Sequence, residues 1–500
     1  MSYVIGIDLG TGSVKGIVLD KSGTVIEQAT ENYPLFHPHK GYSEQKPSDW
    51  IEGTKKVLAT LINKLPQLKT ELAGISISGQ MHSLVLLDED GQPLRNAILW
   101  NDVRTTAQCR EITETLGAKL LAKTKNLALE GFTLPKLLWV KEHEPENWSK
   151  SARFLLPKDY LAYWLTGNQQ MELSDAAGTL LLNVTDEKWD MEIAESFGIS
   201  EEMLPPLVQS MDHVGNIQPI ICEELGIEGI VQIFAGGADN ACAALGAGIV
   251  EEDRAMCSIG TSGVFLSYEG QKEQQYHGKL HYFNHVIKDS YYSMGVTLAA
   301  GQSLTWYKET FASDETFDQL IVEAQGSKTG SNGLLFTPYI MGERTPHVDS
   351  QIRGSFIGMD AGQTRADFTR AILEGITFSL KDSQELMQEI AGKEFTEVIS
   401  VGGGAKSALW LQIQADIFNT KIRTLKTEQG PGLGAAMIAA MGLDWFDSIE
   451  QCVEAFVDYE KEYLPILENV QAYREIYGIY KQVYGQTKEL CHQLLAVNRR

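Results

Sequence analysis

A glycine-rich turn occurs twice in this chain of 500 residues. Residues 9–14 (LGTGSV) and 259–264 (IGTSGV) each lie between two apolar runs. This arrangement predicts two β-hairpins with small residues at their tips, because glycine tolerates a tight turn and a close backbone approach. Exposed N–H groups in such turns form a concavity that binds anions. The two tips therefore predict two related halves that hold one polyphosphate from opposite sides.

The length and charge of the chain narrow the classes of function. A chain of this length exceeds one hydrophobic core, so we expect two large domains. It carries 42 Lys and Arg against 66 Asp and Glu, a net charge of −24. This balance excludes a broad surface for nucleic acid or anionic membrane, which needs positive charge. A local pocket of backbone N–H groups with a metal ion can still bind ATP.

Cysteine usage and hydropathy indicate the compartment. Six cysteines are scattered without a CxxC pair, so neither a zinc ribbon nor a dithiol site is predicted. The first residues lack a signal-peptide pattern, and no apolar run reaches the roughly 18 residues of a membrane span. We therefore expect a reduced, cytoplasmic protein with no membrane partner.

Strand-like and helix-like segments alternate along the chain, which favours an α/β architecture. The pattern predicts a helix over about 47–65 with Ser48 as its N-cap, and mostly helix over 103–230. Strands at 230–234 and 397–401 are each followed by glycines and a helix, over 241–247 and 407–418. Such a junction places N–H groups at the carboxyl end of a strand, where α/β sheets bind ligands. An acidic segment near 251–253 marks a boundary between domains 1–249 and 250–500.

Two aspartates sit where phosphoryl transfer needs carboxylates. Asp8 precedes the first glycine turn and is a candidate magnesium ligand, although an aspartate there also fits a simple turn. Asp239 lies between the strand and the helix near residue 240. An aspartate at that position is by default a helix N-cap, and its functional interpretation is a general base for a substrate hydroxyl. The paired glycine turns favour the functional interpretation of both.

The segment Gln80-Met81-His82 follows a predicted strand in a polar, small-residue neighbourhood. A glutamine and a histidine at a strand end are candidates for hydrogen bonding a polyol. Trp100, at the end of the neighbouring apolar run, is a candidate wall for a sugar, with core packing as the alternative.

Three other patterns in the sequence give weaker indications of function. His277, His281 and His285 are spaced by four, but their aromatic neighbours favour strands over a metal-binding helix. Residues 430–434 (GPGLG) lack the dinucleotide-binding spacing, and the chain has no P-loop motif.

Two longer segments make the chain resemble a known family. Residues 131–143 are similar to the first signature of the FGGY carbohydrate kinases, and residues 354–358 with 367–374 to the second. The resemblance covers nearly the whole chain. It implies the two-domain actin/hexokinase-like (ribonuclease H-like) fold with a catalytic cleft between the domains, and an ATP- and Mg²⁺-dependent kinase.

The resemblance also implies roles for particular residues. Asp239 would be the proton acceptor and Asp8 would lie near the magnesium, with both carboxylates available to the metal. The sugar and ATP sites would take the remaining candidates. These are Gln80, Met81, His82, Trp100 and Asn240 for the sugar, Gly10, Thr11, Gly12, Gly260 and Thr261 for the phosphates, and Gly403 and Gly404 beside the adenosine.

Within the family, residues 78–82, 97–102 and 236–240 are most similar to the members that phosphorylate xylulose. The implied reaction is phosphoryl transfer from ATP to the 5-hydroxyl of D-xylulose, and the family likeness also implies a homodimer. Ser83 and residues 33–35 are instead similar to the gluconate kinases, so gluconate, ribulose or glycerol stay alternatives. A nucleotide-driven binding protein on the same core is the alternative from another class, and it leaves Asp239 and His82 without a purpose.

Overall fold

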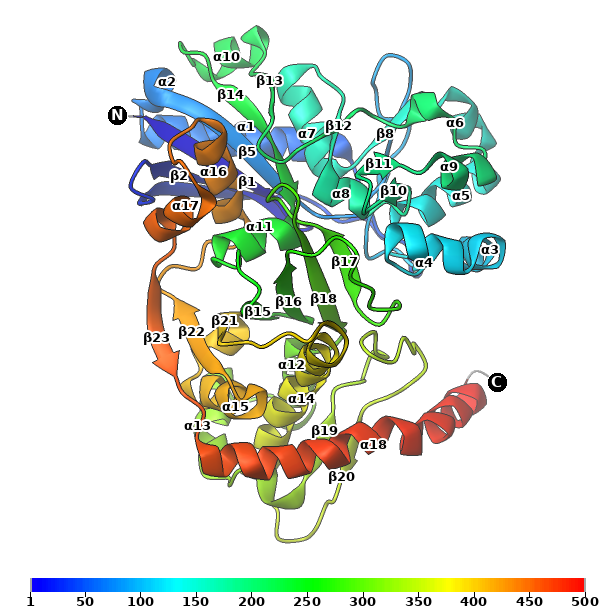
Figure 1. The fold of residues 1–500 in the computed structure, drawn as a ribbon, viewed down its shortest axis with the longest axis vertical. Coiled ribbons are helices and arrows are strands. Elements are labelled where there is room, and N and C mark those ends of the chain that lie inside the picture. The colour runs from blue at the N-terminus through cyan, green and yellow to red at the C-terminus, as the bar shows by residue number, and fades with distance from the viewer. Residues whose placement is uncertain (1, 499–500) are drawn as a thin grey trace.

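The computed structural model describes residues 2–498 and contains two large mixed sheets, one above the other in Figure 1. The first has six strands in the order β13-β14-β5-β1-β2-β3. Their bounds are β1 Tyr3–Leu9, β2 Ser13–Asp20, β3 Val25–Asn32, β5 Leu72–Gly79, β13 His213–Asn216 and β14 Gln232–Ala238.

The second sheet has seven strands in the order β17-β18-β16-β15-β21-β22-β23. Their bounds are β15 Arg254–Ile259, β16 Gly263–Glu269, β17 His281–Asn284, β18 Tyr291–Thr297, β21 Glu397–Gly402, β22 Lys421–Leu425 and β23 Tyr459–Tyr463.

The two sheets share one internal plan. In each, a first hairpin (β1–β2, β15–β16) is extended by a third antiparallel strand, and two parallel strands follow on the other side of the first strand. The order 3-2-1-4-5 thus occurs twice, as β3-β2-β1-β5-β14 and β18-β16-β15-β21-β22. This repeat confirms the predicted hairpins, the two related halves and the two-domain ribonuclease H-like fold. It also makes Ser258, the second residue before Gly260, the counterpart of Asp8.

Helices from both halves of the chain cover the first sheet. α1 (Pro47–Lys64) packs on β2 and β3, and α7 (Pro157–Thr166) on β5 and β14. α16 (Pro431–Gly442) packs on β1, β5 and β14 although it follows the last parallel strand of the second sheet. Figure 1 shows α16 and α17 in orange among the blue strands of the first sheet. Because α16 lies with the first sheet, the helices do not divide between the two sheets at residues 249/250. The domain boundary at that position stays a prediction.

The contact of α16 with α11 (Asp239–Gly246) joins the two halves through small residues. A Cβ on Gly434 would lie 1.9 Å from the Cys242 carbonyl oxygen, and one on Gly6 would lie 2.0 Å from the Gly432 carbonyl oxygen. The backbones of α16, α11 and β1 are therefore as close as glycine permits.

The remaining elements frame these sheets. α14 packs on β16 and β18, and the long α18 runs along the bottom of Figure 1. The other helices are α2 Leu68–Glu71, α3 Thr106–Leu116, α4 Ala118–Thr124, α5 Thr133–His143, α6 Pro145–Lys150, α8 Leu173–Ala177, α9 Met191–Ser196, α10 Pro219–Leu225, α12 Gly301–Phe311, α13 Phe317–Ala324, α14 Arg365–Ala391, α15 Ala408–Phe418, α17 Ile449–Phe456 and α18 Leu467–Asn498. The short strands pair as β4 (Glu44–Gln45) with β7 (Ala97–Ile98), β6 (Val85–Leu87) with β8 (Arg153–Leu155), β9 (Met171–Glu172) with β12 (Leu207–Val208), β10 (Leu182–Asn183) with β11 (Lys188–Trp189), and β19 (Leu335–Thr337) with β20 (Ser355–Ile357).

Three local expectations were wrong. Ser48 is not the N-cap of α1, because Pro47 opens the helix and Lys46 precedes it without a side-chain cap. The region 103–230 contains short strands between its helices. β14 continues through Gly236 and Gly237 directly into α11, with no separate turn. A membrane-spanning helix is absent from the described part of the chain.

Candidate active site between the sheets

A cavity of about 310 Å³ lies between the two halves of the chain. Both halves contribute to its wall. From the first half come Met81, His82, Trp100, Leu129, Gly131, Phe132, Asp239 and Asn240, and from the second half Ser258, Gly260, Ser262, Val264, His281, Met294, Val296 and Arg344. The structure therefore brings six predicted residues, Met81, His82, Trp100, Asp239, Asn240 and Gly260, to one cavity.

Asp239 is the first residue of α11, directly after β14. Its Oδ1 accepts hydrogen bonds from the backbone N (2.7 Å) and side-chain Nδ2 (3.0 Å) of Asn240. No described residue donates to Oδ2. Burial raises the pKa of Asp239 to about 6, which suits a general base near neutral pH.

Asp8 lies near Asp239 at the end of β1. Burial, and then the Asp239 carboxylate, raise the pKa of Asp8 to about 7, while Lys15 opposes this shift. Lys15 is the direct partner of Asp8 across the β1–β2 hairpin, and its Nζ donates to Gln429 Oε1 at 2.7 Å. The contribution of the Asp239 charge to the raised pKa of Asp8 is one that a cation bound near both carboxylates would relieve.

His82 is held as a neutral hydrogen-bond acceptor. Its Nδ1–H donates to the Gly178 carbonyl at 2.8 Å, and its own carbonyl accepts from Thr133 Oγ1 at 2.9 Å. Burial lowers the pKa of His82 to about 3. With Nδ1 protonated, Nε2 carries the lone pair that can accept from a sugar hydroxyl. The backbone φ of His82 is +68°, in the left-handed region, within the turn that follows β5.

The sulfur of Met81 lies between two polar side chains, one from each half of the chain. Its Sδ accepts from Tyr292 OH at 3.6 Å and from Asn240 Nδ2 at 4.0 Å. These contacts tie Asn240, and through it Asp239, to strand β18 of the other half.

Of the two other sugar candidates, Gln80 lies outside the cavity and Trp100 lies at its rim. Gln80 is buried and is not among the lining residues, because its Nε2 donates to Gln45 Oε1 and its Oε1 accepts from Ser83 Oγ. Trp100 is 42% exposed at the cavity rim, which excludes core packing, and its Nε1 donates to Thr11 Oγ1 at 2.9 Å. The first glycine turn thus contacts the rim through Thr11.

A second cavity of about 500 Å³ adjoins the first through Gly260. Its wall includes the predicted Gly260, Thr261, Gly403 and Gly404 and an apolar group, Leu304, Phe317, Ile321, Val322 and Trp410. Gly10, Thr11 and Gly12 do not line it. A glycine-lined end next to an apolar end suits the phosphates and the base of a nucleotide.

Comparisons with known proteins agree with this geometry. Residues 3–246 match the model of the N-terminal domain of the FGGY family of carbohydrate kinases, and residues 255–443 match that of the C-terminal domain. The chain belongs to the FGGY family of carbohydrate kinases. It is 54% identical over 490 residues to a xylulose kinase of Bacillus subtilis (strain 168), covering 98% of each chain.

Solved structures extend the likeness to three dimensions. The ligand-bound xylulose kinase from Lactobacillus acidophilus is 28% identical with a TM-score of 0.93, covering 98% of this chain and 99% of that one. The gluconate kinase from the same organism is also 28% identical with a TM-score of 0.93, covering 97% and 98%. The backbone alone therefore does not separate these two sugars among FGGY kinases.

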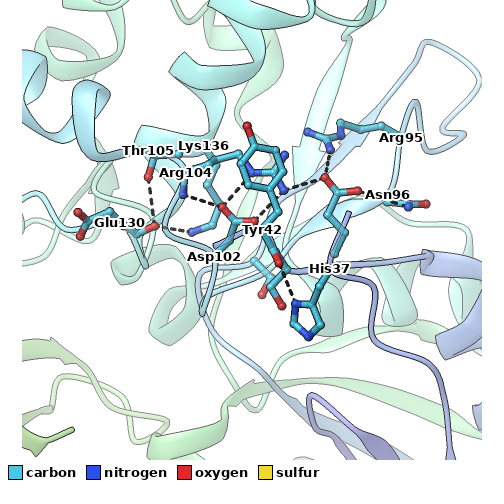
Figure 2. A network of polar contacts seen from close by, with 12 residues as sticks. His37, Tyr42, Arg95, Asn96, Asp102, Arg104, Thr105, Glu130 and Lys136 are labelled. Atoms are coloured by element: carbon cyan, nitrogen blue, oxygen red, sulfur yellow. Dashed lines mark hydrogen bonds and ion pairs between the residues drawn. The ribbon is translucent and has the colours of Figure 1, made fainter. Parts of the chain in front are cut away.

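A buried polar network supports one wall of the smaller cavity in this FGGY kinase. Arg104 donates to both carboxylate oxygens of Asp102, at 2.9 and 2.7 Å, and to Glu44 at 2.7 Å. Lys136 donates to the carbonyls of Glu130 (3.0 Å), Gly131 and Phe132 (2.8 Å). Figure 2 shows Asp102, Arg104 and Lys136 beside one another. The network holds residues 130–132, two of which line the smaller cavity.

Sequence reasoning missed several residues of this site. Lys15, Phe132, His281, Tyr292 and Arg344 received no role from it, except that His281 was considered only as a metal ligand. His281 and Arg344 lie in segments whose position beside the cavity depends on the pairing of β17 with β18 and on the loop after β19. The position of Lys15 opposite Asp8 could have been predicted, because residues at equal distances from a hairpin tip face each other.

Proposed function

We propose that this chain is an ATP-dependent xylulose kinase that transfers the γ-phosphoryl group to the 5-hydroxyl of D-xylulose. The observation that carries the proposal is a buried carboxyl with a raised pKa, Asp239, in a cavity of about 310 Å³ that shares Gly260 with a second cavity of about 500 Å³. The choice of xylulose rests on the full-length similarity to the Bacillus subtilis enzyme.

The chemistry follows from the positions of the side chains. Asp239 Oδ2 orients the hydroxyl and accepts its proton as the oxygen attacks the γ-phosphorus, and ADP leaves on the opposite side. His82 Nε2 and Asn240 fix the sugar, and Trp100 covers it at the rim. The N–H group of Thr261 binds phosphate oxygens, as would those of Thr11 and Gly12 in the first turn. The N–H groups of Gly260 and Gly10 close the two turns on the carbonyls of Ser262 and Ser13, both at 3.0 Å, and the missing side chains leave room for the phosphates. Gly403 and Gly404 let the backbone approach the adenosine.

The residues present fit a magnesium ion. Asp8 and Asp239 offer adjacent carboxylate oxygens, the donor type that Mg²⁺ prefers. The described residues contain no group of three or more His, Cys, Asp or Glu side chains placed to hold a metal, so phosphate oxygens and water would complete its shell. The ion would neutralise charge on the phosphoryl oxygens.

An ADP-release assay over a sugar panel tests the proposal, with mass analysis of the product. The expected result is Mg²⁺-dependent ATP consumption stimulated most by D-xylulose. Preference for gluconate, ribulose or glycerol would replace the substrate and keep the reaction. Slow ATP hydrolysis that no sugar stimulates would point to a nucleotide-driven binding protein instead.

Two further expectations accompany the proposal. A reduced, cytoplasmic location suits an enzyme that consumes ATP and has six free cysteines. A homodimer is expected from the family likeness, and light scattering after gel filtration would measure it.

A further inference from the structure

Arg344 lies in the loop between β19 and β20 and lines the same cavity as Asp239. Its backbone N donates to Glu343 Oε1 at 2.8 Å. Among the described residues, no carboxylate, carbonyl or hydroxyl forms a hydrogen bond or ion pair with its guanidinium. A guanidinium has five donors in a fixed planar fork, so this side chain offers an unused set of donors to the cavity.

The groups around Arg344 do not neutralise it. The neighbouring Glu343 carboxyl accepts from Leu298 N (3.0 Å) and Ser379 Oγ (3.1 Å), and burial raises its pKa to about 8. His82, in the turn after β5, and His281, on β17, line the same cavity as Arg344 and are kept neutral by burial, and the charge of Arg344 lowers their pKa values further. Glu130 acts on Arg344 electrostatically, but its carboxylate accepts from Thr106 Oγ1.

The positive and negative charges of the cavity act on different neighbours. Asp239 raises the pKa of Asp8 and Tyr292, whereas Arg344 lowers those of His82 and His281. Asp239 enters the cavity from the start of α11, whereas Arg344 enters it beside β18, where the adjacent Thr345 exchanges hydrogen bonds with Val296 (Thr345 N to Val296 O at 3.1 Å, Val296 N to Thr345 Oγ1 at 3.0 Å). The acidic and the cationic groups therefore reach the cavity from different elements. A partly buried cation without a partner is unfavourable, and such an arrangement is typical of a position that a ligand completes.

We propose that Arg344 is a specificity-determining residue that donates hydrogen bonds to the sugar oxygens at the end remote from the phosphorylated hydroxyl. This inference rests on the proposed function. In a 2-ketopentose with its 5-hydroxyl at Asp239, that remote end carries the C2 carbonyl and the C1 hydroxyl. Two acceptor oxygens on adjacent carbons match the fork of the guanidinium.

The proposed contact between Arg344 and the sugar has a second consequence, because the residues around the sugar come from both halves of the chain. Asp239 and His82 belong to the first half of the chain, and Arg344 to the second. A sugar bonded to both ends therefore links the halves, so that Arg344 makes sugar binding sensitive to how closely they approach.

The test combines a protein change with a ligand change. Arg344→Met and Arg344→Lys are compared with wild type and with the control Arg353→Met. Arg353 lies in the same loop, and among the described residues its guanidinium donates to the carbonyls of Ser350 and Ile352 alone. The substrates are D-xylulose and 1-deoxy-D-xylulose, which lacks the C1 oxygen. The readouts are kcat/KM, the KM for ATP, and the calorimetric Kd for each sugar.

Arg344→Met is expected to lower kcat/KM for D-xylulose by about 10- to 100-fold, the range of a lost charge-assisted hydrogen bond. The KM for ATP stays the same, and Arg344→Lys gives an intermediate loss. Wild type prefers D-xylulose over its 1-deoxy form by about 10-fold or more, and Arg344→Met removes most of that preference, because both changes delete the hydrogen bond to the C1 oxygen.

Several results would overturn the inference. They are a Kd for D-xylulose in Arg344→Met within twofold of wild type, an equal loss for both sugars, or no preference of wild type for the C1 oxygen. If a substituted protein melts abnormally, the wild-type comparison of the two sugars and Arg344→Lys still decide. Wild type that is inactive on D-xylulose refutes the proposed substrate, whereas active wild type with an unaffected Arg344→Met refutes this inference alone.

Discussion

At the scale of single residues, Asp239 is the side chain to which we assign the proton transfer. Asp239→Asn keeps the shape of the side chain and removes the proton acceptor. We expect turnover to fall by roughly 10²- to 10⁴-fold, the usual contribution of a general base, with the affinity for ATP nearly unchanged. Steady-state kinetics and nucleotide binding by calorimetry measure both. Near-normal turnover would refute the role of Asp239.

The same substitution provides its own folding control. Burial raises the pKa of Asp239 to about 6, so the folded protein disfavours its charged form at pH 8. Asp239→Asn removes that charge, and we expect a melting temperature at or above that of wild type. Lost activity in this variant then reflects lost chemistry. Asp314→Asn, on the exposed turn before α13, serves as the matched neutral control.

The pH dependence of activity should report the same carboxylates. Asp239 and Asp8, with pKa values of about 6 and 7, accept protons as the pH falls. A protonated Asp239 cannot act as a base, so kcat/KM for the sugar should drop about tenfold per pH unit below about pH 6 and level off above about pH 7. His82, with a pKa of about 3, adds no step in this range. A flat profile between pH 5 and 8 would contradict this assignment.

At the scale of elements, the loop of residues 130–132 depends on Lys136. This lysine is fully buried, and three carbonyls accept from its Nζ. Lys136→Met keeps the stem and removes the donors, so the loop should loosen beside the sugar. We expect KM for the sugar to rise by about 10-fold, because several net hydrogen bonds are lost. The KM for ATP, measured in the same assay, should stay within twofold, and an equal rise in both would indicate general misfolding.

The α11–α16 contact makes a second prediction at this scale. In Gly434→Ala the new methyl group meets the Cys242 carbonyl oxygen at 1.9 Å, so the helices must separate. We expect a loss of about 2 to 3 kcal/mol in the free energy of unfolding, as for other overpacked cores. Gly485→Ala in α18 meets nothing within 4 Å and should stabilise slightly, because alanine favours a helix. Urea unfolding of both variants tests the pair, and equal effects would refute the argument.

The sequence predicted the elements whose signals are local. Both glycine hairpins, the strand before Asp239 and the helix near 47–65 depend on nearby residues, and all four are present. Ser48 failed as a cap because Pro47 opens the helix with its own fixed φ. Gln80 is adjacent to two lining residues in sequence, but the turn directs its side chain to Gln45. Arg344 had no local signal, because its place at the cavity depends on long-range packing.

At the scale of the whole molecule, the cavity joins two halves that one ligand can draw together. His82 and Asp239 line the cavity from one half, and Gly260 and Arg344 line it from the other. Binding of sugar with a non-hydrolysable ATP analogue should therefore close the cleft and exclude water. Small-angle scattering should show a smaller radius of gyration with both ligands, and a smaller decrease in Arg344→Met. An unchanged radius in wild type would mean that the cleft is already closed.

The position of α16 also bears on how this polypeptide is made. Its residues cover a face of a sheet whose strands are all synthesised before residue 240, so nearly 200 residues of translation separate the two. During that interval the apolar face of β1 and β5 has no native cover, and a fragment ending at residue 249 would keep that face bare permanently. Such a fragment should aggregate when expressed alone and recover when a segment containing Pro431–Gly442 is supplied.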